Sequence, residues 1–156
     1  MQVQIKNRWT GAVLFECDAP DGMESGLLMR HAAERATEAD AYLTNANLTN
    51  ANLAGAYLAD AYLAGANLAG AKWRGLVINK CPIQIYGLHW AITILDEHMQ
   101  IGCELHSLAE WSAFDDKRIC SMDRSALRFW RENKDALLAM AKANGRGVAA
   151  ESAVTV

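Results

Sequence analysis

The sequence predicts a mainly β chain with some α-helix, in which a short solenoid is capped at both ends by smaller modules. Three observations predict this class. A five-residue period runs over residues 41–75, strand-like alternation with turn residues lies on both sides of it, and helical spacing appears before it and again near the C-terminus. The 156 residues suffice for one ordinary domain or for two small modules.

Residues 1–40 are predicted to form a β-hairpin followed by a capping helix. Val3 and Ile5 alternate with polar residues, and a second apolar run follows Gly11. This pattern is typical of two strands joined by a turn in which glycine takes a positive φ. Leucine, histidine and alanine at helical spacing then predict a helix over 24–36.

Residues 41–75 are predicted to form a coil in which each five-residue unit is one side. The units are AYLTN, ANLTN, ANLAG, AYLAD, AYLAG, ANLAG and AKWRG. A period of five matches neither an α-helix nor a strand, so the first and third residues of all units face inward only if the chain turns once per unit. The alternative, alanine-rich disorder, does not require a leucine in every unit. The predicted core is Ala41, Leu43, Ala46, Leu48, Ala51, Leu53, Ala56, Leu58, Ala61, Leu63, Ala66, Leu68, Ala71 and Trp73.

Residues 76–145 are predicted to form an α+β module. Apolar alternation over 83–102 predicts two or three antiparallel strands. Ser107 and Glu110 have the spacing of a capping box, so a helix is expected to begin at Leu108.

Two further helices and a tail are expected at the C-terminus. An aspartate at 115–116 is expected to cap a short helix, and Asp123 or Ser125 a longer one. The Asn-Gly pair at 144–145 is typical of a left-handed helix end. The tail 146–156 has small residues and no period, and we predict that it is disordered.

The repeats resemble those of the pentapeptide-repeat family, whose pattern is A(N/D)LxG. The resemblance implies a right-handed, four-sided (quadrilateral) β-helix with one pentapeptide per side, so that seven units make slightly less than two coils. Because so short a solenoid buries little core, the flanking segments are expected to cap it. The segments IKNRWTGAVLFE, HMQIGCELHSLAEW and LRFWRENKDALLAM add a resemblance to a pentapeptide-repeat protein type of bacteriophages and prophages.

Charge and hydropathy argue against several function classes. The net charge of −3 gives no reason to expect direct binding to a nucleic-acid backbone. No window approaches the roughly 20 apolar residues of a membrane-spanning helix, and the N-terminus does not read as a signal peptide. A cytoplasmic protein without membrane contact is therefore expected. Its four widely spaced cysteines are typical of free thiols.

Four residues are candidates for a ligand-binding site: His89, Trp90, His106 and Trp111. Their indole rings could stack on a base while the imidazoles meet phosphate in a shared pocket. The alternative is that the aromatic rings are simply core residues of a small α+β module.

Cys103 and His106 have the spacing of half a zinc site, but the sequence offers no second close ligand pair. The alternative is a buried thiol and a surface or capping histidine, so we expect no metal and no cofactor. The same pair would need an orienting third group to act as a catalytic nucleophile and base. Because no oxyanion motif, phosphate-binding glycine loop or HExxH sequence accompanies it, we expect no enzyme.

The resemblance leads us to expect a phage-type, non-enzymatic binding protein that inhibits or sequesters a host factor in counter-defence. The expected partner is a host protein, and a homo-oligomer in the host cytoplasm is expected because short solenoids can pair. One alternative is a sponge for a small nucleotide-like signalling ligand, and another is a DNA mimic that binds DNA gyrase. Mimicry needs a long acidic rod, whereas the only charged side chains between Arg35 and Lys72 are Glu38, Asp40 and Asp60.

Overall fold

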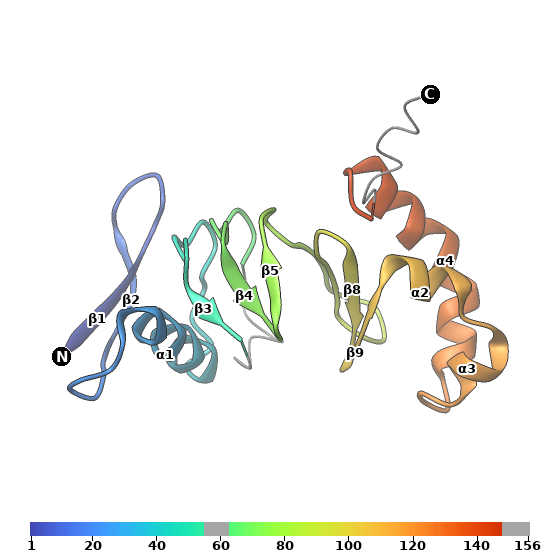
Figure 1. The fold of residues 1–156 in the computed structure, drawn as a ribbon, viewed down its shortest axis with the longest axis horizontal. Coiled ribbons are helices and arrows are strands. Elements are labelled where there is room, and N and C mark those ends of the chain that lie inside the picture. Colours follow the sequence, from blue (N-terminus) through green and yellow to red (C-terminus); the bar gives the residue numbers. More distant parts are fainter. Residues whose placement is uncertain (55–62, 148–156) are drawn as a thin grey trace, which may run out of the picture. The chain divides into compact units, whose positions relative to one another are not determined.

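The computed structural model describes residues 1–54 and 63–147. The chain divides into two compact units, Met1–Pro82 and Ile83–Val156, which are described separately below (Figure 1). Three residues of the predicted repeat core lie outside the described residues: Ala56, Leu58 and Ala61.

The N-terminal hairpin forms as predicted. β1 (Gln2–Lys6) pairs antiparallel with β2 (Val13–Asp18), and Val3 and Ile5 are buried while Gly11 has a φ of +72° in the turn. A two-stranded ribbon is marginally stable alone. The first repeats support it, because the N–H of Asn47 donates to the Lys6 carbonyl at 2.8 Å.

Helix α1 (Ser25–Glu38) covers the start of the repeats, close to the predicted range. It packs against both hairpin strands and against β3 (Asn52–Leu53), and its fully buried face is made of alanines only. Small side chains allow this close approach, since a Cβ on Gly26 would lie 3.9 Å from the Cβ of Asn52.

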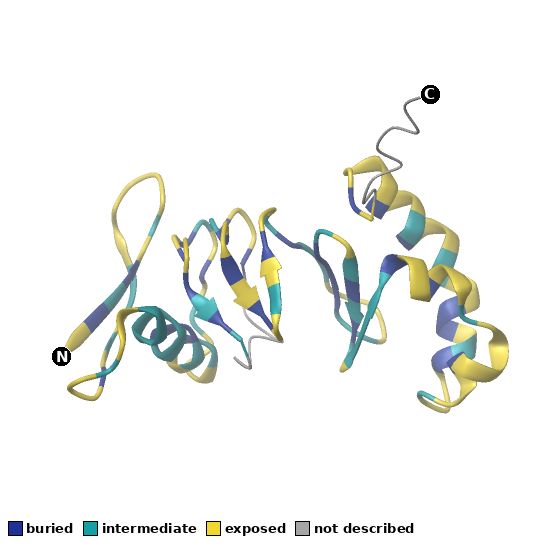
Figure 2. Cartoon of the chain, in the orientation of Figure 1, coloured by how far each residue is buried: buried dark blue, intermediate teal, exposed yellow. Residues whose placement is uncertain are grey.

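The inward register of the repeats is confirmed for the described residues. All five described leucines of the core are at most 1 % exposed, and Trp73 occupies the seventh leucine place at 5 % (Figure 2). The described alanines from Ala46 onward are also buried. Ala41 is half-buried, because only the end of α1 precedes it.

Segments four units apart in the repeats lie side by side in parallel. Asn52 of β3 is opposite Lys72 of β4 (Ala71–Trp73), and Asn47 forms a parallel bridge with Asn67. The Leu48 N–H donates to the Asn67 carbonyl at 3.0 Å in the same ladder. This offset is the one expected if four pentapeptides make one coil.

The corner of each described unit is its fifth residue, which adopts the left-handed backbone region. The φ angles are +60° at Asn45, +57° at Asn50, +70° at Gly65, +73° at Gly70 and +84° at Gly75. Glycine adopts this region at no steric cost and asparagine at a low one. The restriction of this position to few residue types is therefore a backbone requirement.

Asparagine at the second position of a unit stabilises the following turn. Its Oδ1 accepts a hydrogen bond from the backbone N–H two residues later, at 3.2 Å in Asn47, 3.1 Å in Asn52 and 3.2 Å in Asn67. Such side-chain turns replace a backbone hydrogen bond. These outward-facing asparagines therefore have a structural role.

Gly65→Ala is expected to destabilise the compact unit Met1–Pro82 more than Gly75→Ala does. At both sites alanine in the left-handed region costs about 1–2 kcal/mol. A Cβ at residue 65 would also lie 2.2 Å from the Oδ1 of Asn45, whereas residue 75 has nothing within 4 Å. Displacing the Asn45 side chain adds about 1 kcal/mol. Urea unfolding of both variants measures the difference, and equal losses would show that residues 45 and 65 do not lie against each other.

The compact unit Met1–Pro82 continues beyond residue 75, where the solenoid was predicted to end. β5 (Leu76–Ile78) turns back and pairs antiparallel with β4, and the Gly70 N–H donates to the Ile78 carbonyl at 2.7 Å. The thiol of Cys81 lies 3.6 Å from the Leu63 carbonyl. The contacts thus place residues 76–82 with the repeats, while the division into domains stays a prediction.

The second unit contains a four-stranded antiparallel sheet in chain order, where two or three strands were expected. The strands are β6 (Ile83–Ile85), β7 (Ile92–Ile94), β8 (His98–Ile101) and β9 (Glu104–Ser107). Sequence patterning did not predict β9, because Glu104 and His106 occupy the places where an apolar alternation would be recognised.

One face of this sheet carries the core of the unit. Isoleucines of β6 to β8 and Met99 pack against α2 (Leu108–Ala113), α3 (Asp116–Cys120) and α4 (Ala126–Ala143). Register places Glu104 and His106 on this same face, opposite Ile101 and Met99. Buried and exposed residues alternate along α4, as expected for a helix packed on one side (Figure 2).

The predicted helix starts are confirmed. Ser107 and Glu110 form a capping box, in which the Ser107 N–H donates to the Glu110 carboxylate at 2.8 Å and holds the pKa of Glu110 below its ordinary value. Asp115 caps α3 by accepting from the Arg118 N–H at 2.8 Å. Asp123 accepts from the Ser125 N–H at 2.8 Å just before α4.

The predicted disordered tail begins too early. Gly145 has a φ of +66° and turns the chain back over the unit, so that the Gly147 N–H donates to the Asp96 carbonyl at 2.8 Å. Arg146 is 8 % exposed, with its guanidinium 3.6 Å from the Asp96 carboxylate. Residues 148–156 lie outside the described residues.

Among the described helices, none has the length and apolar character needed to cross a bilayer.

Candidate binding pocket

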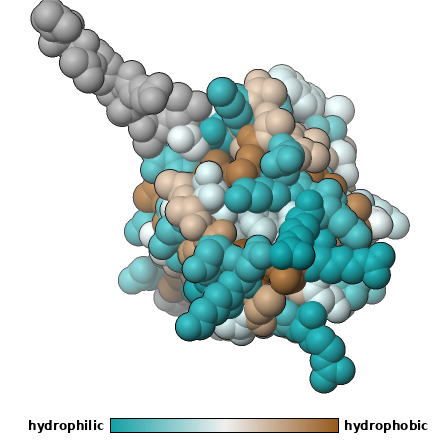
Figure 3. All heavy atoms as spheres, turned by 90° about the vertical axis from the view of Figure 1, so that its right-hand side faces the viewer, coloured by the Kyte–Doolittle hydropathy of each residue, from teal (hydrophilic) through white to brown (hydrophobic). Residues whose placement is uncertain are grey.

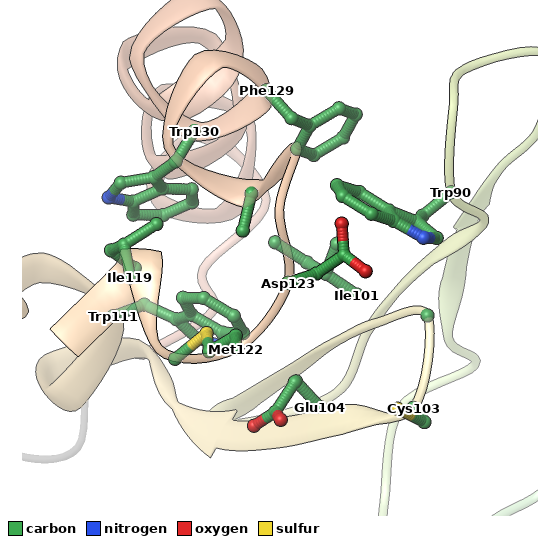
Figure 4. Close-up of a pocket in the computed structure, with 12 residues that line it drawn as sticks. Trp90, Ile101, Cys103, Glu104, Trp111, Ile119, Met122, Asp123, Phe129 and Trp130 are labelled. Atoms are coloured by element: carbon green, nitrogen blue, oxygen red, sulfur yellow. The ribbon is translucent and has the colours of Figure 1, made fainter. Parts of the chain in front are cut away.

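A pocket of about 120 Å³ opens in the second unit (Figure 4). Its lining comes from five places: the segment before β7, the turn and strands at β8–β9, helix α2, the end of α3 with the loop that follows, and the first turns of α4. It is therefore a product of tertiary packing.

Four aromatic side chains line this pocket: Trp90, Trp111, Phe129 and Trp130. The Trp90 and Phe129 rings meet edge to face at 5.1 Å between centroids. The Trp111 and Trp130 rings are 5.0 Å apart at an interplanar angle of 40°. Paired rings of this kind hold one another in place, so we expect the walls to be rigid.

Trp111 anchors the floor of the pocket. It is 2 % exposed, and its Nε1 donates to the Met99 carbonyl at 2.7 Å. This hydrogen bond ties α2 to β8 and fixes the orientation of the indole. Trp111 is therefore both a core residue and a lining residue.

Gly102 leaves space for the Trp90 side chain at the rim of the pocket. It has a φ of +56°, and a Cβ there would lie 3.2 Å from Cδ1 of the indole. Trp90 itself is half-buried, with one edge on Phe129. Trp90 is thus the aromatic wall that an incoming group meets first.

Two carboxylates complete the lining, Glu104 and Asp123. Glu104 Oε2 lies 2.7 Å from His106 Nε2, and Asp123 Oδ1 accepts the Ser125 N–H. Among the described residues that line the pocket there is no lysine or arginine. The pocket is accordingly aromatic in its walls and acidic at its polar positions.

The four candidate ligand residues lie in one region, but only Trp90 and Trp111 share the pocket. His106 is held edge to face between Trp111 at 5.2 Å and Phe114 at 5.0 Å. His89 is exposed, stands edge-on to Trp90 at 4.3 Å, and lines a separate hollow with Arg128. A ligand role for the four residues stays a prediction.

The acidic and helix-borne lining residues were not predicted. Asp123 was expected only as a possible helix cap, and no ligand-binding role was predicted for Phe129 or Trp130. No local sequence pattern links these lining residues to Trp90. They approach Trp90 only after several helices and strands have packed together.

The weak metal candidates do not form a site in the described part of the chain. Cys103 is exposed in the turn between β8 and β9, while His106 on β9 faces Glu104 and the aromatic rings. No group of three or more His, Cys, Asp or Glu side chains in residues 1–54 and 63–147 is arranged to hold a metal ion.

The face of the molecule drawn in Figure 3 is mostly hydrophilic. Figure 3 shows polar side chains over most of this view, with apolar atoms emerging between them. Among the described residues of the second unit, Met140 on α4 is 40 % exposed. Scattered apolar residues of this kind are normal on a protein surface, so the aromatic pocket is the stronger candidate for recognition.

Comparison with known families bears on the repeats. Residues 39–75 match the family model for pentapeptide repeats in eight copies, so the matched segment begins before Ala41. The end of α1 explains the earlier start, since Ala36 is buried like a first-position alanine and Asp40 has the corner φ of +51°. No curated protein and no solved structure matches the chain.

Proposed function

We propose that this chain is a non-catalytic, phage-type binding protein that inhibits or sequesters a host factor in counter-defence. Its pentapeptide repeats would form a right-handed, four-sided coil that serves as a rigid support. Pentapeptide-repeat proteins are generally structural or binding proteins. The proposal further places the protein in the host cytoplasm, as a homo-oligomer.

The aromatic pocket of the second unit carries this proposal. Preformed pockets with tryptophan walls are typical of the few positions that supply most of the energy of a protein interface. Trp90 is half-buried and stands at the rim, where a partner side chain can contact it. A protein partner is therefore the ligand class that we favour.

The nucleotide sponge is less well supported. Phosphates are anionic, whereas the polar lining of the pocket consists of the Glu104 and Asp123 carboxylates. The negative carboxylates repel a negative phosphate held in the same pocket, which disfavours its binding. His106, the candidate phosphate contact, has its Nε2 2.7 Å from the Glu104 carboxylate.

The gyrase-binding DNA mimic is less well supported too. Within the described part of residues 39–75 the only acidic side chain is Asp40, and two basic side chains, Lys72 and Arg74, outweigh its charge. A surface that imitates duplex DNA needs a dense row of negative charge. This segment offers short polar and small apolar side chains instead.

The proposal is tested by affinity purification from host cells, comparing the wild-type chain with Trp90→Leu. We expect one host protein to be retained in near-equimolar amount by the wild type and at least tenfold less by the variant, because the variant loses the aromatic wall. We also expect the retained protein to be less active in extracts that contain the wild type. Equal retention by both chains, or turnover of a substrate by the purified chain, would contradict the proposal.

A further inference from the structure

We infer that the pocket lined by Trp90, Glu104 and Asp123 takes the guanidinium group of an arginine side chain presented by the partner protein. This inference rests on the proposed function, and it names the chemistry that the partner must offer.

The aromatic walls favour a cation. A guanidinium or ammonium group over the face of a tryptophan is attracted by the ring's quadrupole, and tryptophan gives the strongest such interaction. Three of the lining side chains are tryptophans and a fourth is phenylalanine. The pocket's volume of about 120 Å³ suits the end of one side chain better than a folded nucleotide.

The carboxylates favour the same ligand. In the described part of the chain, Asp123 engages Oδ1 with the Ser125 N–H and Glu104 engages Oε2 with His106, so each retains a second oxygen. Both residues line the pocket, Glu104 on β9 and Asp123 in the loop before α4 (Figure 4). An incoming cation therefore meets negative charge at the polar positions of the lining.

The basic side chains near the pocket either interact with other groups or do not line the pocket. Arg128 is 2.9 Å from Glu132 and lines the neighbouring hollow, and Arg118 stacks on Phe114 at 5.1 Å. Arg124 follows Asp123 in the chain and is exposed, but it does not line the pocket. The charge of the lining itself is thus negative.

Arginine fits this arrangement better than lysine. Its planar guanidinium stacks on an aromatic face while its five N–H donors reach carboxylates in the same plane. An ammonium group is a strongly hydrated point charge and gains less from a flat aromatic wall. The half-buried Trp90 offers its indole ring at the pocket, with the Phe129 ring edge to face against it at 5.1 Å.

The test uses four blocked tripeptides, Gly-X-Gly, in which X is arginine, citrulline, lysine or glutamate. Binding to the full-length chain is followed by NMR of the tryptophan indole N–H signals. We expect the arginine peptide to shift the Trp90 signal at millimolar concentration, and the citrulline peptide, equal in shape but neutral, to bind at least tenfold more weakly. Lysine is expected to be intermediate and glutamate inactive.

Two variants and one control assign the site. Asp123→Asn keeps an amide oxygen for the Ser125 N–H but removes the charge, and it should weaken the arginine peptide about five- to tenfold. Asp135→Asn removes an equal charge from an exposed position of α4 outside the pocket and should leave binding unchanged. Trp90→Leu should weaken the arginine peptide by a similar factor to Asp123→Asn.

The outcomes separate this inference from the proposed function. Equal binding of arginine and citrulline, tighter binding of lysine, binding of a mononucleotide instead, or no Trp90 shift would overturn the arginine assignment. If the assignment fails while a host protein is still retained in a Trp90-dependent manner, the proposed function stands. If the arginine peptide binds as expected but no host protein is retained, the site stands and the proposed function fails.

Discussion

Leu48→Asp is expected to unfold the first unit. Leu48 is fully buried, and its backbone N–H donates to the carbonyl of Asn67, four pentapeptides later in the chain. Aspartate would place a charge there without a partner, which costs several kcal/mol in addition to the lost apolar contacts. The sum approaches the whole stability of a small domain, about 5–15 kcal/mol. The backbone amide signals of Met1–Pro82 should collapse in an NMR spectrum.

Thr44→Asp is the matched control for this change. It adds the same charge at an exposed fourth position of the repeat. Its effect on stability should stay within about 0.5 kcal/mol, as for most surface substitutions. Comparable losses from both variants would show that the inward register of the coil is wrong, and a folded Leu48→Asp chain would show the same.

Trp111→Ala is expected to destabilise the second unit by about 3–5 kcal/mol. The indole is 2 % exposed and packs on Trp130 and Phe114. Its removal leaves a large cavity under the pocket, and the Met99 carbonyl loses the donor that lies 2.7 Å from it. Urea unfolding followed through amide signals of residues 83–147 measures this loss.

Trp111→Phe separates the two contributions. Phenylalanine retains an aromatic ring in the core but cannot donate to the Met99 carbonyl, so we expect a smaller loss of about 1–3 kcal/mol. Full stability of Trp111→Ala would mean that this residue lies at the surface. Because Trp111 supports the fold, it is unsuitable for assigning ligands, and Trp90 is the better choice.

The repeats were predictable because their period has one simple structural solution. A leucine in every five-residue unit can be buried throughout only if the chain turns once per unit, and Leu43, Leu63 and Leu68 are buried accordingly. Capping signals were equally local, so the starts at Leu108 and Asp116 followed from Ser107 and Asp115.

The pocket was predictable only in part, because its residues come from elements distant in the chain. Trp90 and Trp111 were selected from a local cluster of aromatic and histidine residues. Phe129 lines the same pocket only because α4 packs over the sheet. Strand β9 escaped prediction since its inward residues include Glu104, and the tail was misjudged because Arg146 has no local signal for burial.

Native mass spectrometry of the protein, purified gently from host cells, tests most directly whether it captures a protein partner. The account predicts a species whose extra mass equals that of one host protein chain per binding site, present for the wild type and lost for Trp90→Leu. An extra mass of nucleotide or metal size would contradict the account, and so would the bare mass of the chain in any oligomeric state.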